Sequence, residues 1–201
     1  MVQSVREFMG SLPPGASTFL KRAVGLFIAW KLFYILLFQP LGEPDGWLVR
    51  MLGEATVSTL NLFIGEERFR VWHTLSPTDA DSAVYEACAV VYRTGMQSDV
   101  GIYAPCNGLE LMVLAVGFIL CFDGPARRKL MYAMAALFGV FLVNVLRCSL
   151  LTVIKTGHPD YFEFSHKYLF NIAGYSFVFL IWMHYVNGIM GASPSIQEIK
   201  T

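Results

Sequence analysis

Apolar residues in this chain gather in long uninterrupted runs. The firmest runs cover residues 108–122, 130–154 and 168–187, and an earlier run covers residues 23–39. At about 1.5 Å per residue the earlier run reaches roughly 25 Å, which is just enough to cross the hydrocarbon core of a bilayer. No small-residue cleavage site follows it, so a retained anchor is expected there rather than a signal peptide. The pattern predicts a membrane helix in each of the four places.

The segment 47–65 is also apolar, but it carries a polar stripe. Arg50, Glu54, Ser58 and Asn61 recur at helical spacing, which gives the predicted helix one polar face. Such a helix either lies in the membrane interface or lines a protein interior, because lipid on all sides would leave these side chains unsolvated. We expect an amphipathic or re-entrant helix here.

The interval 66–105 is the longest polar part of the chain. It contains the stretches "SAVYEACAVVYR" at 82–93 and "SDVGIYAP" at 98–105, which are rich in β-branched and aromatic residues, with "TGMQ" between them. This pattern is typical of two strands joined by a turn. We therefore predict a small β-hairpin in a loop outside the membrane.

Composition supports the membrane interpretation. Hydrophobic residues make up 55% of the 201 residues and charged residues only 15%, and the mean hydropathy is +0.52, whereas a soluble domain carries about 25% charge. A net charge of zero argues against nucleic acid as the main partner. The predicted fold class is an all-α polytopic membrane protein: a single domain over residues 1–201, with a bundle of about 4–5 transmembrane or membrane-embedded helices and a small outer hairpin.

Basic residues predict the orientation of this bundle. The short connector at 123–130 reads "DGPARRKL" and the N-terminal segment 1–22 ends in a basic pair; short basic segments stay cytoplasmic. Cys106 and the loop 155–167 then lie on the outer side of the cytoplasmic membrane. This multi-pass arrangement requires that segment 47–65 does not cross fully, or that it is paired with a second excursion.

An arginine lies inside the run 130–154, where lipid disfavours it. Arg147 precedes Ile154 by seven residues, which places it about 10 Å inside the outer end of the helix. A central arginine costs about 2.5–3.5 kcal/mol on insertion scales, so an intramembrane arginine is a functional candidate by default. Asn144, three residues earlier, shares its helical face. The alternative is an arginine that snorkels to the outer headgroups.

The stretch "APCNGLELM" at 104–112 places a thiol directly before a membrane helix. We predict that Asn107 is the N-cap of this helix and that Glu110 is its third residue, a variant of the capping box. Cys106 then lies one residue outside the helix, beside its unpaired N–H groups. The positive end of the helix dipole stabilises a thiolate, which is the reactive form of cysteine.

A structural role for Cys106 remains as the alternative. It would then be an inert buried thiol or one half of a disulfide with Cys88, which belongs to the same outer region. Cys121 and Cys148 are interpreted as packing thiols.

His166 stands immediately before the final helix, at the same depth as Cys106 in the predicted topology. A histidine with its ordinary pKa of about 6.5 takes or gives a proton at working pH. His158 is the second candidate, His73 lies far from the helix ends, and His184 falls near the cytoplasmic end of the last helix. The cysteines and histidines lack the paired spacing of a zinc site, so neither a metal nor another cofactor is expected.

These motifs together resemble the exosortase/archaeosortase family of membrane cysteine transpeptidases. The resemblance rests on "CNG" at Cys106–Gly108 opening a helix, "NVLR" at Asn144–Arg147 near the outer end of the next, and His166 opening the last. It covers roughly residues 83–185, including the hairpin ahead of the cysteine. The chain departs from the family in its short length and in the "HKYLFNIAGYSF" around the histidine.

The resemblance implies an activity. Cys106 would match the family's nucleophile, Arg147 its arginine and His166 its histidine. Such enzymes cut a C-terminal sorting signal made of a short motif, a membrane helix and a basic tail, and pass the protein to a surface acceptor. The expected partners are therefore membrane-anchored proteins within the lipid bilayer.

We expect Cys106 to attack a substrate carbonyl, Arg147 to hold the oxyanion and His166 to move the proton. Asn144 is expected to orient Arg147 or the substrate backbone, and Tyr103 and Asn107 to line the site. Attack on the thioester by an amine makes the enzyme a transpeptidase, and attack by water makes it a protease. The second class of function left open is a non-catalytic membrane subunit of a polysaccharide or secretion assembly.

Overall fold

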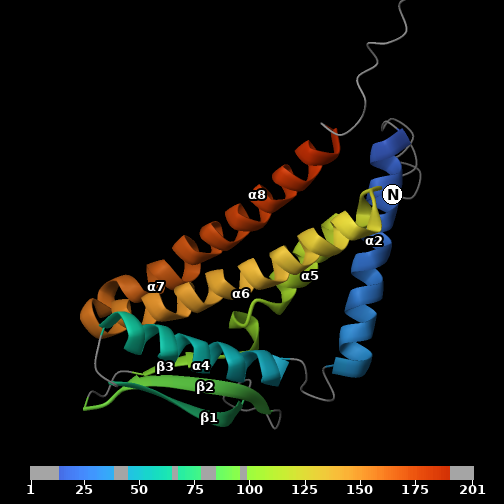
Figure 1. The fold of residues 1–201 in the computed structure, drawn as a ribbon. Helices are drawn as coiled ribbons and strands as arrows, with labels where there is room; N and C mark the ends of the chain where they lie inside the picture. Colours follow the sequence, from blue (N-terminus) through green and yellow to red (C-terminus); the bar gives the residue numbers. More distant parts are fainter. Residues whose placement is uncertain (1–13, 39–44, 65–67, 78–84, 96–98, 191–201) are drawn as a thin grey trace, which may run out of the picture.

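The computed structural model describes residues 14–38, 45–64, 68–77, 85–95 and 99–190. Residues 1–13, which belong to the predicted cytoplasmic segment 1–22, lie outside the described residues. Residue 39, the last of the predicted run 23–39, also lies outside them. The described part of the chain is mostly helical, with one small antiparallel sheet packed at one end of the helices (Figure 1).

All four predicted membrane runs are helical. They form α2 (Pro14–Phe33, continued by a π-helical turn at Tyr34–Phe38), α5 (Leu109–Cys121), α6 (Ala126–Gly157) and α8 (Phe170–Met190). Three short helical turns lead from α6 into α8: Pro159–Tyr161, Phe162–Phe164 and Ser165–Leu169. Helix α6 extends past its apolar run at both ends and α8 at its C-terminal end, because the helical backbone bonds do not require apolar side chains.

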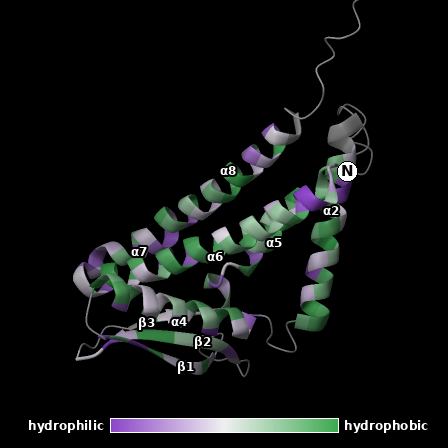
Figure 2. Cartoon of the chain, viewed as in Figure 1, coloured by the Kyte–Doolittle hydropathy of each residue, from purple (hydrophilic) through white to green (hydrophobic). Residues whose placement is uncertain are grey.

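Among the described residues, two helical stretches are long and apolar enough to cross a membrane, Ala126–Gly157 and Pro159–Gly188, and α5 is apolar but shorter. Hydrophobic residues predominate along the length of α5, α6 and α8 (Figure 2). Several large apolar side chains on α6 and α8 are more than half exposed: Leu130, Phe138, Leu146, Ile172, Phe179 and Leu180. Exposed apolar surface on this scale fits contact with lipid. The number of crossings stays a prediction.

The helices α5, α6 and α8 contact one another around one apolar cluster. Its buried members come from each of the three helices and include Met112, Ala115, Ile119, Val140, Val178 and Tyr185. This packing holds the start of α5 against the second half of α6, where the predicted site residues lie.

The predicted hairpin is confirmed and belongs to a larger sheet. Strands β2 (Tyr85–Arg93) and β3 (Asp99–Ile102) pair antiparallel, and β1 (Phe69–Pro77) pairs antiparallel with β2 along its whole length, in the order β1-β2-β3. The prediction of a loop at residues 69–77 was wrong, because β1 lies there. Charged residues around Phe69 interrupt the alternation of apolar and polar positions that predicts a strand, and β1 is stabilised by its pairing with β2.

Segment 47–65 forms α4 (Asp45–Ile64), which lies between the sheet and α6 (Figure 1). Its buried side chains join residues of the sheet and α6 in a second apolar cluster, which includes Val49, Leu52, Leu60, Ala89, Val91, Ile102 and Val145. A Cβ at Gly53 would come within 2.8 Å of the Ala89 Cβ, so the glycine allows the helix to approach the sheet closely. The predicted polar stripe is exposed at Arg50, Glu54 and Ser58, and the opposite face packs on protein.

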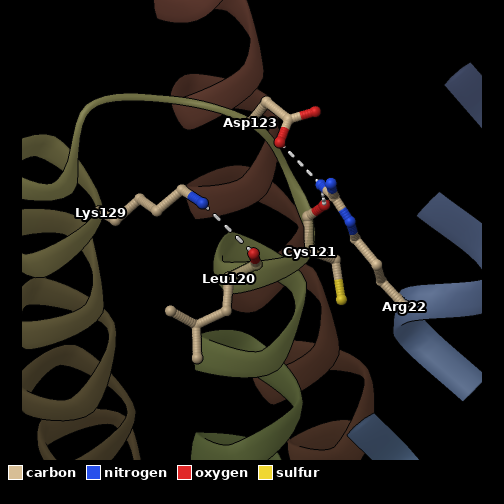
Figure 3. A network of polar contacts seen from close by, with 5 residues as sticks. All are labelled: Arg22, Leu120, Cys121, Asp123 and Lys129. Carbon is tan, nitrogen blue, oxygen red and sulfur yellow. Dashed lines mark hydrogen bonds and ion pairs between the residues drawn. The ribbon is translucent and has the colours of Figure 1, made fainter. Parts of the chain in front are cut away.

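The connector between α5 and α6 is held by basic side chains (Figure 3). Arg22 of α2 pairs with Asp123 at 2.7 Å and also donates to the Cys121 carbonyl at 3.3 Å, while Lys129 donates to the Leu120 carbonyl at 3.3 Å. Cations near the last carbonyls of a helix interact favourably with its dipole. The two basic segments of the chain therefore meet at one end of the molecule, about 27 Å along α6 from Arg147.

Candidate active site

The cysteine of the "CNG" motif sits in a tight turn between the sheet and α5. After β3 the chain forms a 3₁₀ turn at Ala104–Cys106, in which the Cys106 N–H donates to the Tyr103 carbonyl at 2.8 Å. The Asn107 N–H donates to the Ala104 carbonyl at 3.1 Å. The turn holds Cys106 half-buried, with its side chain against the cluster that joins α4, the sheet and α6.

The predicted capping box is wrong. The N-cap of α5 is Gly108, with a left-handed φ of +81° and no side-chain cap. The Asn107 Oδ1 still accepts from the Leu109 N–H at 2.8 Å, as a capping side chain does, but Glu110 accepts from Lys31 at 3.0 Å and does not reach back to the Asn107 N–H. A left-handed residue at this position favours glycine, which local capping rules do not anticipate. Cys106 is therefore two residues from the N-cap, where the helix dipole is weaker than predicted.

The structure brings the predicted nucleophile and histidine together. The Cys106 Sγ and His166 Nε2 atoms lie 3.8 Å apart, although the two residues are 60 positions apart in the sequence. His166 belongs to the π-helical turn Ser165–Leu169, and its ring stacks on Phe162 with the centroids 5.8 Å apart. Single π-helical turns are frequent at functional sites, because the extra residue redirects a side chain.

Arg147 and Asn144 reach the same region from α6. Both line a polar cavity of about 340 Å³, together with Asn107, Gly108 and Pro105 from the cysteine turn. The Arg147 Nε and Asn144 Nδ2 atoms are buried and have no hydrogen-bond partner among the described residues. The cavity thus combines two unsatisfied donors with the turn that carries the thiol.

Two acidic residues of this cavity, Asp45 and Glu86, were not predicted from the sequence. Asp45 at the start of α4 accepts from the Asn107 Nδ2 and from the Tyr34 hydroxyl, each at 2.6 Å, and Glu86 of β2 also lines the cavity. Asp45 lies two residues before the predicted helix 47–65, and an aspartate at the start of a helix is common for capping reasons alone. That local role gave no signal that the carboxylate would meet a turn 62 positions later.

Tyr103 does not line this cavity, and neither do Cys106 and His166, so the predicted place of Tyr103 in the site stays a prediction. Its ring lies over Gly101, where a Cβ would come within 2.7 Å of the ring. Burial, and then the neighbouring Cys88, raise the pKa of the Tyr103 hydroxyl. Tyr103 therefore packs on the sheet.

The remaining histidines lie elsewhere. His158 is exposed beside Tyr161, His73 pairs with Glu54 at 3.0 Å, and the ring of His184 lies 5.9 Å from that of Tyr132.

All four cysteines are free thiols, and Cys88, Cys121 and Cys148 are buried. The alternative of a disulfide between Cys88 and Cys106 is therefore not realised. Within the described ranges, no three His, Cys, Asp or Glu side chains lie together as a metal site requires.

An apolar cavity of about 400 Å³ adjoins the polar one. It lies between α2, α5 and α8, and it shares several lining residues with the polar cavity: Trp30, Lys31, Glu110, Leu111 and Tyr175. The ion pair between Lys31 and Glu110, 3.0 Å long, stands at the junction. An apolar groove thus leads from between the helices to the cysteine turn.

Replacing Glu86 with glutamine is expected to raise the melting temperature of the protein near neutral pH. Burial, and then the charge of Asp45, raise the pKa of the Glu86 carboxyl above its ordinary value of 4.5. The folded protein holds this proton more tightly than the unfolded chain does, so stability falls as the pH rises above that value. The increase in melting temperature caused by Glu86→Gln should therefore become smaller as the pH is lowered. Thermal unfolding in detergent at several pH values measures this dependence.

Replacing Asp123 provides a control for which the expected change in melting temperature at neutral pH has the opposite sign. Its hydrogen bond and ion pair with Arg22 hold the pKa of the Asp123 carboxyl below its ordinary value. The stability from this pair is present at neutral pH and is lost as the pH falls through the lowered pKa. Asp123→Asn should accordingly lower the melting temperature at neutral pH. A neutral-pH loss of stability in Glu86→Gln as well would contradict the prediction.

Comparison with known proteins adds one finding. A family model described as transmembrane exosortase matches residues 9–187, a range that includes every site residue named above. The chain has no significant match among curated proteins or among solved structures.

Proposed function

This chain belongs to the transmembrane exosortase family, and from this premise we propose that it is a membrane cysteine transpeptidase. Its substrate is a protein that ends in a membrane-anchored sorting signal, which it cleaves before transferring the protein to a surface acceptor. The observation that carries the proposal is the distance of 3.8 Å between the Cys106 Sγ and the His166 Nε2. A thiol beside an imidazole is the arrangement that activates a cysteine nucleophile.

The first step forms the acyl-enzyme. His166 accepts the Cys106 proton, and the sulfur attacks the scissile carbonyl carbon, so that a C–S bond forms and the carbonyl electron pair moves onto the oxygen. Arg147 stabilises this oxyanion from the adjoining cavity. The tetrahedral intermediate then collapses, the C–N bond breaks, and the leaving amine takes the proton from the His166 imidazolium.

The second step releases the product. An acceptor amine attacks the thioester carbonyl and gives its proton to His166, which in turn protonates the departing sulfur as the C–S bond breaks. With an amine the product is a transferred protein, and with water it is a hydrolysed one. The free Cys106 thiol is restored in either case.

The site lies on the outer side of the cytoplasmic membrane in this proposal. The basic residues around Asp123 mark the cytoplasmic end, and the cysteine turn lies at the opposite end of α5. Helix α5 has 13 residues, so it rises only about 20 Å and falls roughly 10 Å short of a hydrocarbon core about 30 Å thick. The site is therefore recessed beneath the outer surface, at the same depth as Arg147.

The apolar groove between α2, α5 and α8 provides lateral access for a substrate that arrives through the bilayer. Its walls are apolar, as the flank of a substrate membrane helix requires, and it ends at the polar cavity beside Cys106. A helix docked in the groove delivers the residues that precede it to the thiol.

Filling this groove is expected to slow substrate processing about tenfold, which corresponds to about 1.4 kcal/mol. Leu114 lines the groove and is 44% exposed, so Leu114→Trp places an indole where the substrate helix docks. The rate of Cys106 alkylation by a small thiol reagent should remain unchanged, because the cysteine turn is untouched. Leu146→Trp is the matched control, since Leu146 is 53% exposed on α6 and does not line the groove. Equal processing by the two variants would contradict lateral access through this groove.

Trapping the acyl-enzyme tests the proposed function directly. Cells that express the full chain are quenched with acid, and mass spectrometry of Cys106-containing peptides identifies any attached polypeptide. The proposal expects a thioester between Cys106 and the new C-terminus of a protein whose missing segment is a membrane helix with a basic tail. A Cys106 that carries no adduct, and that resists a membrane-impermeant thiol probe, would instead indicate a non-catalytic membrane subunit.

A further inference from the structure

Buried polar atoms without partners are unevenly distributed in this protein. Five side-chain atoms of this kind occur among the described residues: Thr56 Oγ1, Asn144 Nδ2, Arg147 Nε, Ser149 Oγ and Tyr185 OH. Only Asn144 and Arg147 of these also line the cavity beside the cysteine turn. A buried donor without a partner destabilises the fold, and each such group in a native fold calls for a physical explanation.

Asn144 is positioned by the cysteine turn itself. Its side chain is 5% exposed, and a Cβ at Gly108 would clash with its Nδ2. The carboxamide therefore occupies the space that the glycine leaves open at the start of α5. This packing places the Asn144 Nδ2, a hydrogen-bond donor, beside Gly108, which follows the nucleophilic Cys106 by two positions.

Three backbone donors next to the sulfur are already used. The Cys106 N–H bonds the Tyr103 carbonyl, and the Asn107 N–H bonds the Ala104 carbonyl. The Leu109 N–H bonds the Asn107 Oδ1. Many nucleophilic enzymes hold the oxyanion with such backbone N–H groups, and these three are not free to do so here.

The Asn107 carboxamide is occupied in the same way, because its Nδ2 donates to Asp45. The buried side-chain donors without a partner that line the cavity therefore belong to α6: the Asn144 Nδ2, and one turn further along the helix the Arg147 Nε.

On the basis of the proposed function, we infer that Asn144 is a catalytic residue whose Nδ2 donates a hydrogen bond to the scissile carbonyl oxygen. Arg147 Nε is the second donor to the same oxygen. As the Cys106 sulfur bonds to the carbonyl carbon, the carbonyl electron pair moves to the oxygen and the two donors strengthen their bonds to it. Neither donor gives up its proton, and both bonds weaken again when the C–N bond breaks and the carbonyl reforms. The missing partner of the buried carboxamide is thus the substrate.

Two thiol reagents separate this role from a positional one. p-Nitrophenyl acetate acylates a thiol through a tetrahedral oxyanion and releases p-nitrophenolate, whereas iodoacetamide alkylates a thiol by direct displacement without an oxyanion. Both rates are measured for Cys106 in the full chain in detergent, with the Cys106→Ala protein as the blank. Asn144→Leu should slow acylation about 10²-fold and leave alkylation within about twofold of wild type.

Stability gives an independent readout. Leucine has the branched shape of asparagine but a larger volume, so Asn144→Leu removes an unsatisfied buried donor and adds bulk at the same place, and its melting temperature should stay close to that of wild type. Ser149→Ala is the matched control, because Ser149 is an unpartnered buried residue of the same helix, 6% exposed, that does not line the cavity. Both of its reaction rates should match wild type. Asn144→Ala repeats the measurement if the leucine variant does not fold.

Two results would overturn the inference. Unchanged acylation in the Asn144 variants would show that the carboxamide does not contact the oxyanion. Equal losses of acylation and alkylation, with a lower melting temperature, would assign Asn144 a structural role. Failure of the proposed function looks different, because wild-type Cys106 would then react with neither reagent above the Cys106→Ala blank.

Discussion

Replacing Cys106 with serine is expected to reduce substrate processing at least about 10³-fold. The imidazole of His166, 3.8 Å from the sulfur, accepts a proton readily from a thiol but far less readily from a hydroxyl, whose pKa is much higher. Processing is measured in cells as the truncated fraction of a co-expressed protein that ends in a membrane helix and a basic tail.

The fold should tolerate this substitution, because serine differs from cysteine by a single atom and Cys106 is only half-buried. Cys88→Ser is the matched control. Cys88 is a buried free thiol of β2 whose pKa is raised by burial, so its loss should leave the rate of processing at the wild-type level. Wild-type processing by Cys106→Ser would remove this residue from the mechanism.

Replacing Arg147 with lysine is expected to reduce processing about 10²- to 10³-fold, nearly as much as replacement with alanine. The Arg147 Nε is buried and unpartnered at the edge of the polar cavity. Lysine keeps the positive charge but has no donor at that point of the side chain, and its ammonium is a more strongly hydrated point charge. The kinetic readout is a fall in kcat with little change in KM, because the interaction forms mainly in the transition state.

Arg147→Lys also distinguishes a catalytic role of Arg147 from a role in which its side chain extends to the outer headgroups. A lysine extends to the headgroups as readily as an arginine does, so a snorkelling residue at this position would leave Arg147→Lys fully active. Arg127→Lys in the exposed connector is the control for a charge-conserving change on the same helix. Normal processing by both variants would support the snorkelling role.

The helices were predictable because their signal is local. Long apolar runs require helices in lipid, since each backbone N–H and C=O must be satisfied within its own segment. The same reasoning found the β2–β3 hairpin, whose two strands are close in the sequence. Strand β1 was not predicted, because charged residues at its start obscure the alternation of apolar and polar positions.

The candidate site was predictable in its residue types more than in its geometry. Arg147 stood out because lipid penalises a charge, and Cys106 and His166 stood out at helix starts. Local capping rules assigned the N-cap to Asn107, whereas the carboxamide of Asn144 leaves room only for a glycine at the cap position. Capping rules consider one helix at a time and cannot include a neighbour that packs against it.

The sequence by itself determined which segments are helical, which end of the molecule is basic, and which side chains are too polar for their surroundings. Each of these properties follows from interactions between residues a few positions apart or between a residue and its solvent. Only the tertiary structure decided that α4 packs between the sheet and α6, that Asp45 holds Asn107, and that the sulfur of Cys106 meets His166. These contacts join residues about 60 positions apart, and their free energy depends on how whole helices pack, which no local pattern encodes.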